Sequence, residues 1–283
     1  MKDQLFKIAL ILSSLLIVFL MGGIIFSLVS GGIPAFVEYG INFIFSSEWN
    51  PNPDNEQYGA LPFISGTLMT SFLALLFCIP LSFPIALFTG DYFKGTKIAS
   101  FVGTMVDLLA GIPSIVYGLW GFYTLRPFII NMGLSQQGFG VFTSAIVLTI
   151  MIIPYATSLS SEFIKMVPND LKEAAYALGA TKLEVVQNVI FPSAGSGIFA
   201  SFVLALGRAL GETMAVTMLI GNVNIVPTSI FSSGNTMASV IANQFGEADG
   251  IKLSSLLAIG LLLFVITAIV NALGRLIIKK LSV

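Results

Sequence analysis

The chain contains long apolar runs separated by short polar segments, and this feature constrains its fold more than any other. The runs lie at roughly 8–29, 62–89, 99–125, 139–158, 190–221 and 254–278. About 20 apolar residues in a helix are enough to cross the roughly 30 Å hydrocarbon core of a bilayer. Only 10% of the residues are charged, whereas an ordinary soluble domain has about 25%. The sequence therefore predicts an all-α, polytopic membrane helical bundle with about six transmembrane helices.

Lys and Arg are distributed unevenly between the segments that join these runs. One side has only Arg126 and Lys252, and Arg208 lies within a run. The other side has Lys2, Lys7, Lys94, Lys97, Lys165, Lys172, Lys182, Arg275, Lys279 and Lys280. Because cytoplasmic loops carry the excess of Lys and Arg, we expect both termini in the cytoplasm. The loop at 30–61, which is acidic and has no Lys or Arg, is then extracytoplasmic.

The longest cytoplasmic segment, at about 159–190, is predicted to form two short helices joined by a tight turn. Asp170 favours a helix N-terminus, and Gly179 suits the left-handed residue that ends a helix. Thr181 is followed three residues later by Glu184, which is the capping-box pattern of a new helix. These signals predict a compact helix-turn-helix on the cytoplasmic side.

The first of these helices carries an apolar stripe at helical spacing, formed by Leu171, Ala174, Ala175 and Leu178. Such a stripe is expected to bury its surface against another element. Either it packs on the cytoplasmic ends of the protein's own helices, or it inserts into a groove on a soluble partner. Periodicity alone leaves both possibilities open.

Three charged residues lie within the apolar runs and away from the ends of the runs: Asp107, Arg208 and Glu212. Charged side chains in a membrane usually face the bundle interior or a pathway. Arg208 is placed near the middle of its run, and Glu212 follows four residues later, so in one continuous helix the two share a face and can pair. The pair is either a structural ion pair or part of an oxyanion site.

In an oxyanion site, the guanidinium of Arg208 would bind the anion, because its planar fork of donors matches phosphate geometry. The carboxylate of Glu212 would repel an anion unless the anion has a proton to donate. Phosphate near neutral pH carries such a proton and sulfate does not, which would give discrimination. Asp107 is interpreted as pairing with Arg208, lining the route, or capping a kink at Gly111-Ile112-Pro113.

Glu173-Ala174-Ala175, followed by Gly179 and later by Pro192, resembles the EAA loop of ABC importer permeases. The resemblance implies a type I ABC importer permease fold with coupling helices near 168–190. It also implies that Glu173, Ala174, Ala175 and Gly179 form the docking site for the ATPase subunit.

GRALGETMAVTMLIGN at 207–222 resembles the fifth-span signature of bacterial phosphate permeases, of the PstC type rather than the sister PstA type. Segments 58–68, 111–121 and 145–154 agree. The resemblance implies a subunit of the cytoplasmic (inner) membrane that imports inorganic phosphate. Its partners would be a PstA-like sister permease, two copies of an ATPase subunit and an extracytoplasmic phosphate-binding protein. It places Arg208 and Glu212 at charged positions associated with translocation.

On this interpretation, the chain divides into 1–61 (first span and acidic outer loop), 62–278 (the ABC importer transmembrane core) and the cytoplasmic tail 279–283. It lacks the G-x-x-x-x-G-K-[ST] phosphate cradle, so we expect no catalytic residue, no cofactor and no metal, with ATP bound by the partner subunit. A nucleic-acid partner is not expected. The alternative is a stand-alone, ion-coupled secondary transporter for a small anion, in which Asp107 and Glu212 bind protons or cations.

Overall fold

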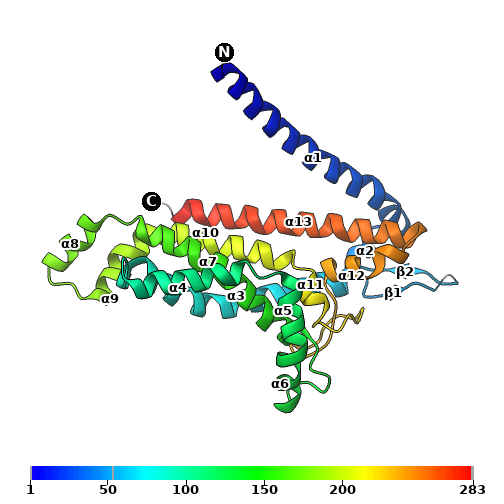
Figure 1. Cartoon of the computed structure of the whole chain (residues 1–283). Helices are drawn as coiled ribbons and strands as arrows, with labels where there is room; N and C mark the ends of the chain where they lie inside the picture. Colours follow the sequence, from blue (N-terminus) through cyan, green and yellow to red (C-terminus); the bar gives the residue numbers. More distant parts are fainter. Residues whose placement is uncertain (1, 53, 282–283) are drawn as a thin grey trace.

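The computed structural model describes residues 2–52 and 54–281, and most of them form helices (Figure 1). The α-helices in this part of the chain are α1 (Lys2–Tyr39), α2 (Asn42–Phe45), α3 (Leu61–Leu87), α4 (Lys97–Ala110), α5 (Ser114–Trp120), α6 (Arg126–Asn131), α7 (Val141–Lys165), α8 (Asn169–Ala177), α9 (Lys182–Val185), α10 (Phe191–Leu210), α11 (Met214–Thr217), α12 (Met237–Gln244) and α13 (Gly250–Leu281). Short π-helices extend three of them at Phe88–Tyr92 (η1), Gly121–Leu125 (η2) and Val186–Ile190 (η3), and a 3₁₀ turn, η4, spans Phe245–Glu247.

The number and type of the spans agree with the sequence prediction. Five helical segments are long and apolar enough to cross a membrane, and the bent pair α4 with α5–α6 makes up to six. The long helices α3, α7, α10 and α13 run side by side (Figure 1). The main buried core lies between α3, α7 and α10, and it includes Ala74, Cys78, Ile152 and Ala205. The chain is therefore a polytopic helical membrane protein.

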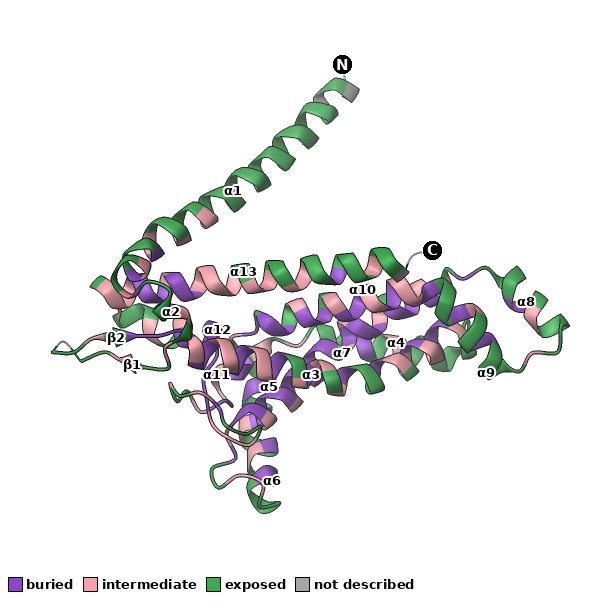
Figure 2. Ribbon diagram, turned by 180° about the vertical axis from the view of Figure 1, so that it is seen from behind, coloured by how far each residue is buried: buried purple, intermediate pink, exposed green. Residues whose placement is uncertain are grey.

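The first helix, α1, leaves the bundle at a steep angle, and most of its length is exposed (Figure 2). It contacts α13 only near its C-terminal end. There the hydroxyl of Ser254 donates to the carbonyl of Gly31 (2.7 Å) and accepts from the amide N–H of Ala35 (2.9 Å). Gly32 is needed for this approach, because a Cβ at Gly32 would lie 3.1 Å from the backbone of Ala258. The rest of α1 presents an apolar surface suited to lipid or to another membrane subunit.

A small aromatic cluster closes the end of the bundle that the sequence assigns to the outside. Two short antiparallel strands, β1 (Trp49–Asn50) and β2 (Gln57–Tyr58), pair Trp49 with Tyr58. The indole of Trp49 packs edge-on against Tyr58 and Phe63, with 4.8 Å between ring centroids in each case. The predicted outer loop 30–61 is therefore partly ordered structure, since the end of α1, α2 and this hairpin all fall within it.

The third apolar run is bent far more sharply than the predicted kink. The axes of α4 and the α5–α6 segment differ by 94° across the break at Gly111-Ile112-Pro113. Proline removes a backbone donor and disfavours helical geometry in the preceding residue. With 14 residues, α4 is about 21 Å long, which is shorter than the roughly 30 Å hydrocarbon core. The α5–α6 segment projects sideways from the bundle (Figure 1).

The prediction of a continuous fifth span over 190–221 is wrong. The helix ends at Leu210, and Gly211 follows as the C-cap. Glycine is the poorest helix former after proline, and the carboxylate of Glu212 accepts the Ala215 amide N–H (3.3 Å), which starts the separate helix α11. The chain then passes through an irregular segment to α12. At the other end, α9, η3 and α10 follow one another as a single helical segment, Lys182–Leu210.

Candidate functional site

The helices α8 and α9 lie at one end of the bundle and form the predicted helix-turn-helix (Figure 1). Asp170 lies in the first turn of α8, and Gly179 has a φ of 87° directly after the helix. The hydroxyl of Thr181 accepts the amide N–H of Glu184 (3.4 Å), and the Glu184 carboxylate accepts the amide N–H of Thr181 (2.7 Å). The left-handed glycine and the capping box are both confirmed.

The apolar stripe on α8 is mostly exposed. The side chain of Leu178 is 89% exposed and that of Leu171 is 50% exposed, whereas Ala175 packs partly against the core. Glu173 and Ala174 are exposed too. In this chain, the stripe is therefore not covered by the protein's own helices, and it forms a surface on which a soluble partner can bury apolar area.

An ion pair that sequence reasoning missed connects α8 to the end of α3. The ammonium of Lys172 donates to the carboxylate of Asp91 in η1. Both side chains are largely buried, with exposures of 8% for Lys172 and 16% for Asp91. Beside this pair, the ammonium of Lys182 lies 5.4 Å from the ring centroid of Tyr92. One signal for this pair is present in the sequence, since Asp91 is an acid that lies directly after an apolar run.

Arg208 lies in the last turn of α10 rather than near the middle of a span. Its side chain is exposed on the bundle surface, and the guanidinium carbon lies 4.7 Å from the ring centroid of Tyr155 on α7. A guanidinium over a tyrosine face is attracted by the ring quadrupole. The ring therefore holds Arg208 against α7 and leaves its N–H donors available to an anion.

Glu212 does not share a helical face with Arg208, and of the two alternatives that the sequence allowed, the structural ion pair between them does not form among the described residues. Among the described residues, the ion pairs are Lys165–Glu162 and Lys172–Asp91. The helix ends between Arg208 and Glu212, so the spacing of four residues no longer places them one turn apart. Glu212 is 8% exposed, and its carboxylate bonds to the start of α11.

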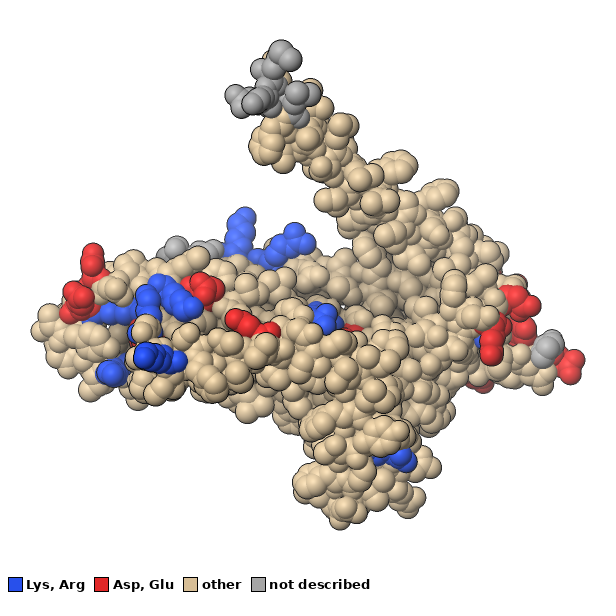
Figure 3. Space-filling model, viewed as in Figure 1, with Lys and Arg blue, Asp and Glu red and all other residues tan. Residues whose placement is uncertain are grey.

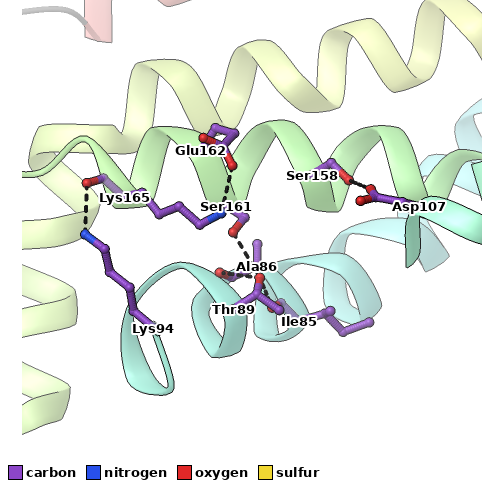
Figure 4. A network of polar contacts seen from close by, with 9 residues as sticks. All are labelled: Ile85, Ala86, Thr89, Lys94, Asp107, Ser158, Ser161, Glu162 and Lys165. Carbon is purple, nitrogen blue, oxygen red and sulfur yellow. Dashed lines mark hydrogen bonds and ion pairs between the residues drawn. The ribbon is translucent and has the colours of Figure 1, made fainter. Parts of the chain in front are cut away.

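Asp107 is exposed on α4, and its carboxylate accepts a hydrogen bond from the hydroxyl of Ser158 on α7 (3.1 Å; Figure 4). It therefore neither pairs with Arg208 nor caps the bend after Ala110. Ser158 follows Tyr155 by three residues, and side chains at this spacing share a helical face. Arg208 and Asp107 thus flank successive turns of one face of α7.

The face shared by α4, α7 and α10 carries charges that lipid cannot easily accommodate. Figure 3 shows Lys and Arg gathered toward the end that carries α8 and α9, acidic residues at both ends of the bundle, and isolated charges between the ends. An Arg or Asp facing hydrocarbon costs about 2.5–3.5 kcal/mol on insertion scales. This face is therefore expected to be covered by another protein surface or by an aqueous route.

The fold is that of the membrane subunit of a type I ABC importer. Residues 82–283 match the family described as "Binding-protein-dependent transport system inner membrane component". Among solved structures, the inward-facing MetNI methionine ABC transporter matches with a TM-score of 0.63 and 18% identity, covering 78% of this chain and 95% of that chain. A bacterial ABC transporter for the acidic polysaccharide alginate matches with a TM-score of 0.60 and 18% identity, covering 99% and 100%.

Similarity to individual proteins shows which members of this family the chain resembles. The phosphate transport system permease protein PstC of Mesorhizobium japonicum is 40% identical, covering 100% of this chain and 91% of the relative. The protein of the same name from Haemophilus influenzae is 41% identical, covering 99% and 94%. The chain belongs to the family of PstC-type permease subunits within the binding-protein-dependent transport systems.

Proposed function

We propose that this chain is the permease subunit of an ATP-driven importer that moves inorganic phosphate across the bacterial cytoplasmic membrane, while a separate subunit hydrolyses ATP. The near full-length similarity to phosphate permeases supports the substrate and the importer class. The structural observation that carries the mechanism is the exposed Arg208 on a face that lipid cannot easily cover. The same relatives argue against a stand-alone ion-coupled carrier.

In the proposed assembly, a PstA-like sister permease covers the face formed by α4, α7 and α10 and encloses the route. Two copies of the ATPase subunit bind at the end that carries α8 and α9, and an extracytoplasmic phosphate-binding protein delivers the substrate at the other end. Both termini are then cytoplasmic, in agreement with the uneven distribution of Lys and Arg. The chain itself binds no ATP, cofactor or nucleic acid.

In the proposed pathway, the guanidinium of Arg208 donates hydrogen bonds to the passing anion and neutralises its charge. The Glu212 carboxylate is the proposed acceptor of a hydrogen bond donated by protonated phosphate. One of its carboxylate oxygens already accepts the Ala215 amide N–H, and the other oxygen is left to accept from the anion. Motion at the docking residues Glu173, Ala174, Ala175 and Gly179 reaches Arg208 through the unbroken helix from α9 to α10. A second connection runs from α8 to α3 through Lys172 and Asp91.

The test is phosphate uptake by Arg208→Gln in the assembled importer, with assembly and ATPase activity measured in parallel. We expect uptake to be lost while the complex still assembles, because the anion loses its cationic partner. Arg126→Gln is a matched control, since Arg126 also stacks on an aromatic ring (Phe139, 4.1 Å from the guanidinium carbon to the centroid) but lies outside the α4, α7 and α10 face. Equal uptake in the two variants would contradict the proposed role of Arg208.

A further inference from the structure

A polar cavity of about 410 Å³ lies between the end of α3, the first turns of α4 and the second half of α7. The cavity is at the end of the bundle that carries α8 and α9, and Figure 4 shows part of its wall. Arg208, Tyr155 and Glu212 are not among its lining residues, and the cavity approaches the Arg208 site only at its far end, where Asp107 and Ser158 line it.

The wall of the cavity is rich in hydroxyl groups, and one of them lacks a partner. The hydroxyls of Thr89 and Ser161 are 3.0 Å apart and bond to each other (Figure 4). Thr157 lies one turn before Ser161 and also lines the cavity. Its side chain is 2% exposed, and its oxygen has no hydrogen-bond partner among the described residues. Because buried hydroxyls are nearly always hydrogen-bonded, the Thr157 hydroxyl is available to bond with a polar group that enters this space.

One end of the cavity is electropositive. Lys94 lines it, and the ammonium contacts the backbone carbonyl of Lys165 at 3.5 Å. The ion pairs among the described residues involve other lysines, so no carboxylate neutralises Lys94. Thr96 caps the 14-residue helix α4 there, and its hydroxyl accepts the Ala99 amide N–H (3.2 Å). The first amides of a helix lack intrahelical acceptors and attract anions.

The acidic groups that line the cavity do not neutralise the positive charge at its Lys94 end. Glu162 is paired with Lys165, with 2.7 Å between the ammonium nitrogen and a carboxylate oxygen. Asp107 bonds to Ser158, and it lies ten residues after Lys97 on α4, which corresponds to about 15 Å along the helix. An anion at the Lys94 end therefore meets the Lys94 ammonium, the first amides of α4 and several hydroxyls. Asp107, the acid that forms no ion pair among the described residues, lies at the far end of the cavity.

We propose that this cavity is a second phosphate-binding site, which holds the phosphate group of either inorganic phosphate or an anionic lipid headgroup. Lys94 and the start of α4 supply charge complementarity, and the hydroxyls of Thr89, Thr157 and Ser161 supply hydrogen bonds. A phosphate bound here bridges α3, α4 and α7. The site rests on the proposed function only in being assigned to the cytoplasmic side, where transported phosphate is released.

The experiment uses the assembled importer in lipid nanodiscs, with Ser100→Cys as a reporter on the cavity wall. Ser100 is exposed, whereas the native Cys78 is fully buried and should not react with maleimide. In neutral phosphatidylcholine discs, we expect millimolar inorganic phosphate to slow labelling of the reporter several-fold. Adding Lys94→Gln should abolish this protection. Adding Lys97→Gln, which removes an equal charge from α4 outside the cavity, should preserve it. Thr104→Cys on the same wall serves as a second reporter.

A second arm distinguishes the two sources of the phosphate group. If discs of anionic phosphatidylglycerol slow labelling without added phosphate, and Lys94→Gln reverses this, the ligand is a lipid headgroup. Protection only by added phosphate identifies the free ion. If labelling is unaffected in both kinds of disc, or if Lys94→Gln and Lys97→Gln behave alike, the site is refuted. Because labelling does not require transport, normal uptake alongside a negative labelling result refutes this site and leaves the proposed function intact.

Discussion

Replacing Lys172 by Met should loosen α8 from the end of α3, because Asp91 would keep a largely buried charge without its partner. Breaking a fully buried ion pair costs about 3–5 kcal/mol, whereas exposed pairs contribute about 0.2–1 kcal/mol. Exposures of 8% and 16% place this pair nearer the buried limit. We therefore expect a local cost of about 2–3 kcal/mol, which raises the population of detached α8 by roughly 30- to 150-fold.

The assay for this prediction combines hydrogen exchange of the α8 amides in the assembled importer with the number of ATP molecules hydrolysed per phosphate imported. Exchange should accelerate and the ratio should rise in Lys172→Met. Asp91→Asn combined with Lys172→Met should recover much of the protection, because no uncompensated charge remains. Lys182→Met, which removes only a cation–π contact with Tyr92, is the control. Unchanged exchange and unchanged stoichiometry in Lys172→Met would refute the role of this pair in coupling.

Three further predictions follow from positions described above. Gly179→Asp should uncouple ATP hydrolysis from uptake, because it places a negative charge on the proposed docking surface; the bundle should stay folded, because a Cβ there meets no atom within 4 Å and the strain from the φ of 87° is confined to the turn. Gly179→Asn, which meets the same strain without the charge, is the control, and normal coupling in the Asp variant would contradict the prediction. Gly66→Ala should lower the melting temperature of the purified chain, because its Cβ would lie 2.0 Å from the backbone oxygen of Asn235; Gly103→Ala, with open space around it, should have little effect. Burial raises the pKa of the Tyr58 hydroxyl from 10.0 to about 12, so the fold should lose stability as pH rises from about 10 through about 12. Tyr58→Phe should reduce that loss when melting temperatures are measured over an alkaline pH series. An unchanged pH dependence in the variant would contradict the link between Tyr58 and alkaline unfolding.

The features that were predicted correctly are set by local chemistry. Apolar runs of bilayer length determine the helical spans, and the conformations of Gly179, Thr181 and Glu184 depend on residues within a few positions of each other. The break after Leu210 was missed because Gly211 is a weak stop signal. In this structure, the break is reinforced by the bond between Glu212 and α11, which depends on how the following segment folds.

Contacts between distant segments account for the rest of what the sequence did not reveal. Lys172 and Asp91 are 81 residues apart, and neither position carries a pattern that selects the other. The pairing of Asp107 with Ser158 across two helices has the same origin. For the candidate site, the sequence identified the charged residues within the spans, but their partners became visible only in the packed bundle.

The uninterrupted helical segment from α9 into α10 makes the chain mechanically stiff between the docking end and Arg208. Lys182 and Arg208 are 26 positions apart, which corresponds to about 39 Å of helix. If this segment pivots as a rigid lever about one end, a tilt of roughly 10° displaces the other end by about 7 Å over that length. The π-turn at Val186–Ile190 is the one widened turn in this segment, so under the proposed function it is the point where motion of the docking helices would be converted into rotation of the helix that carries Arg208.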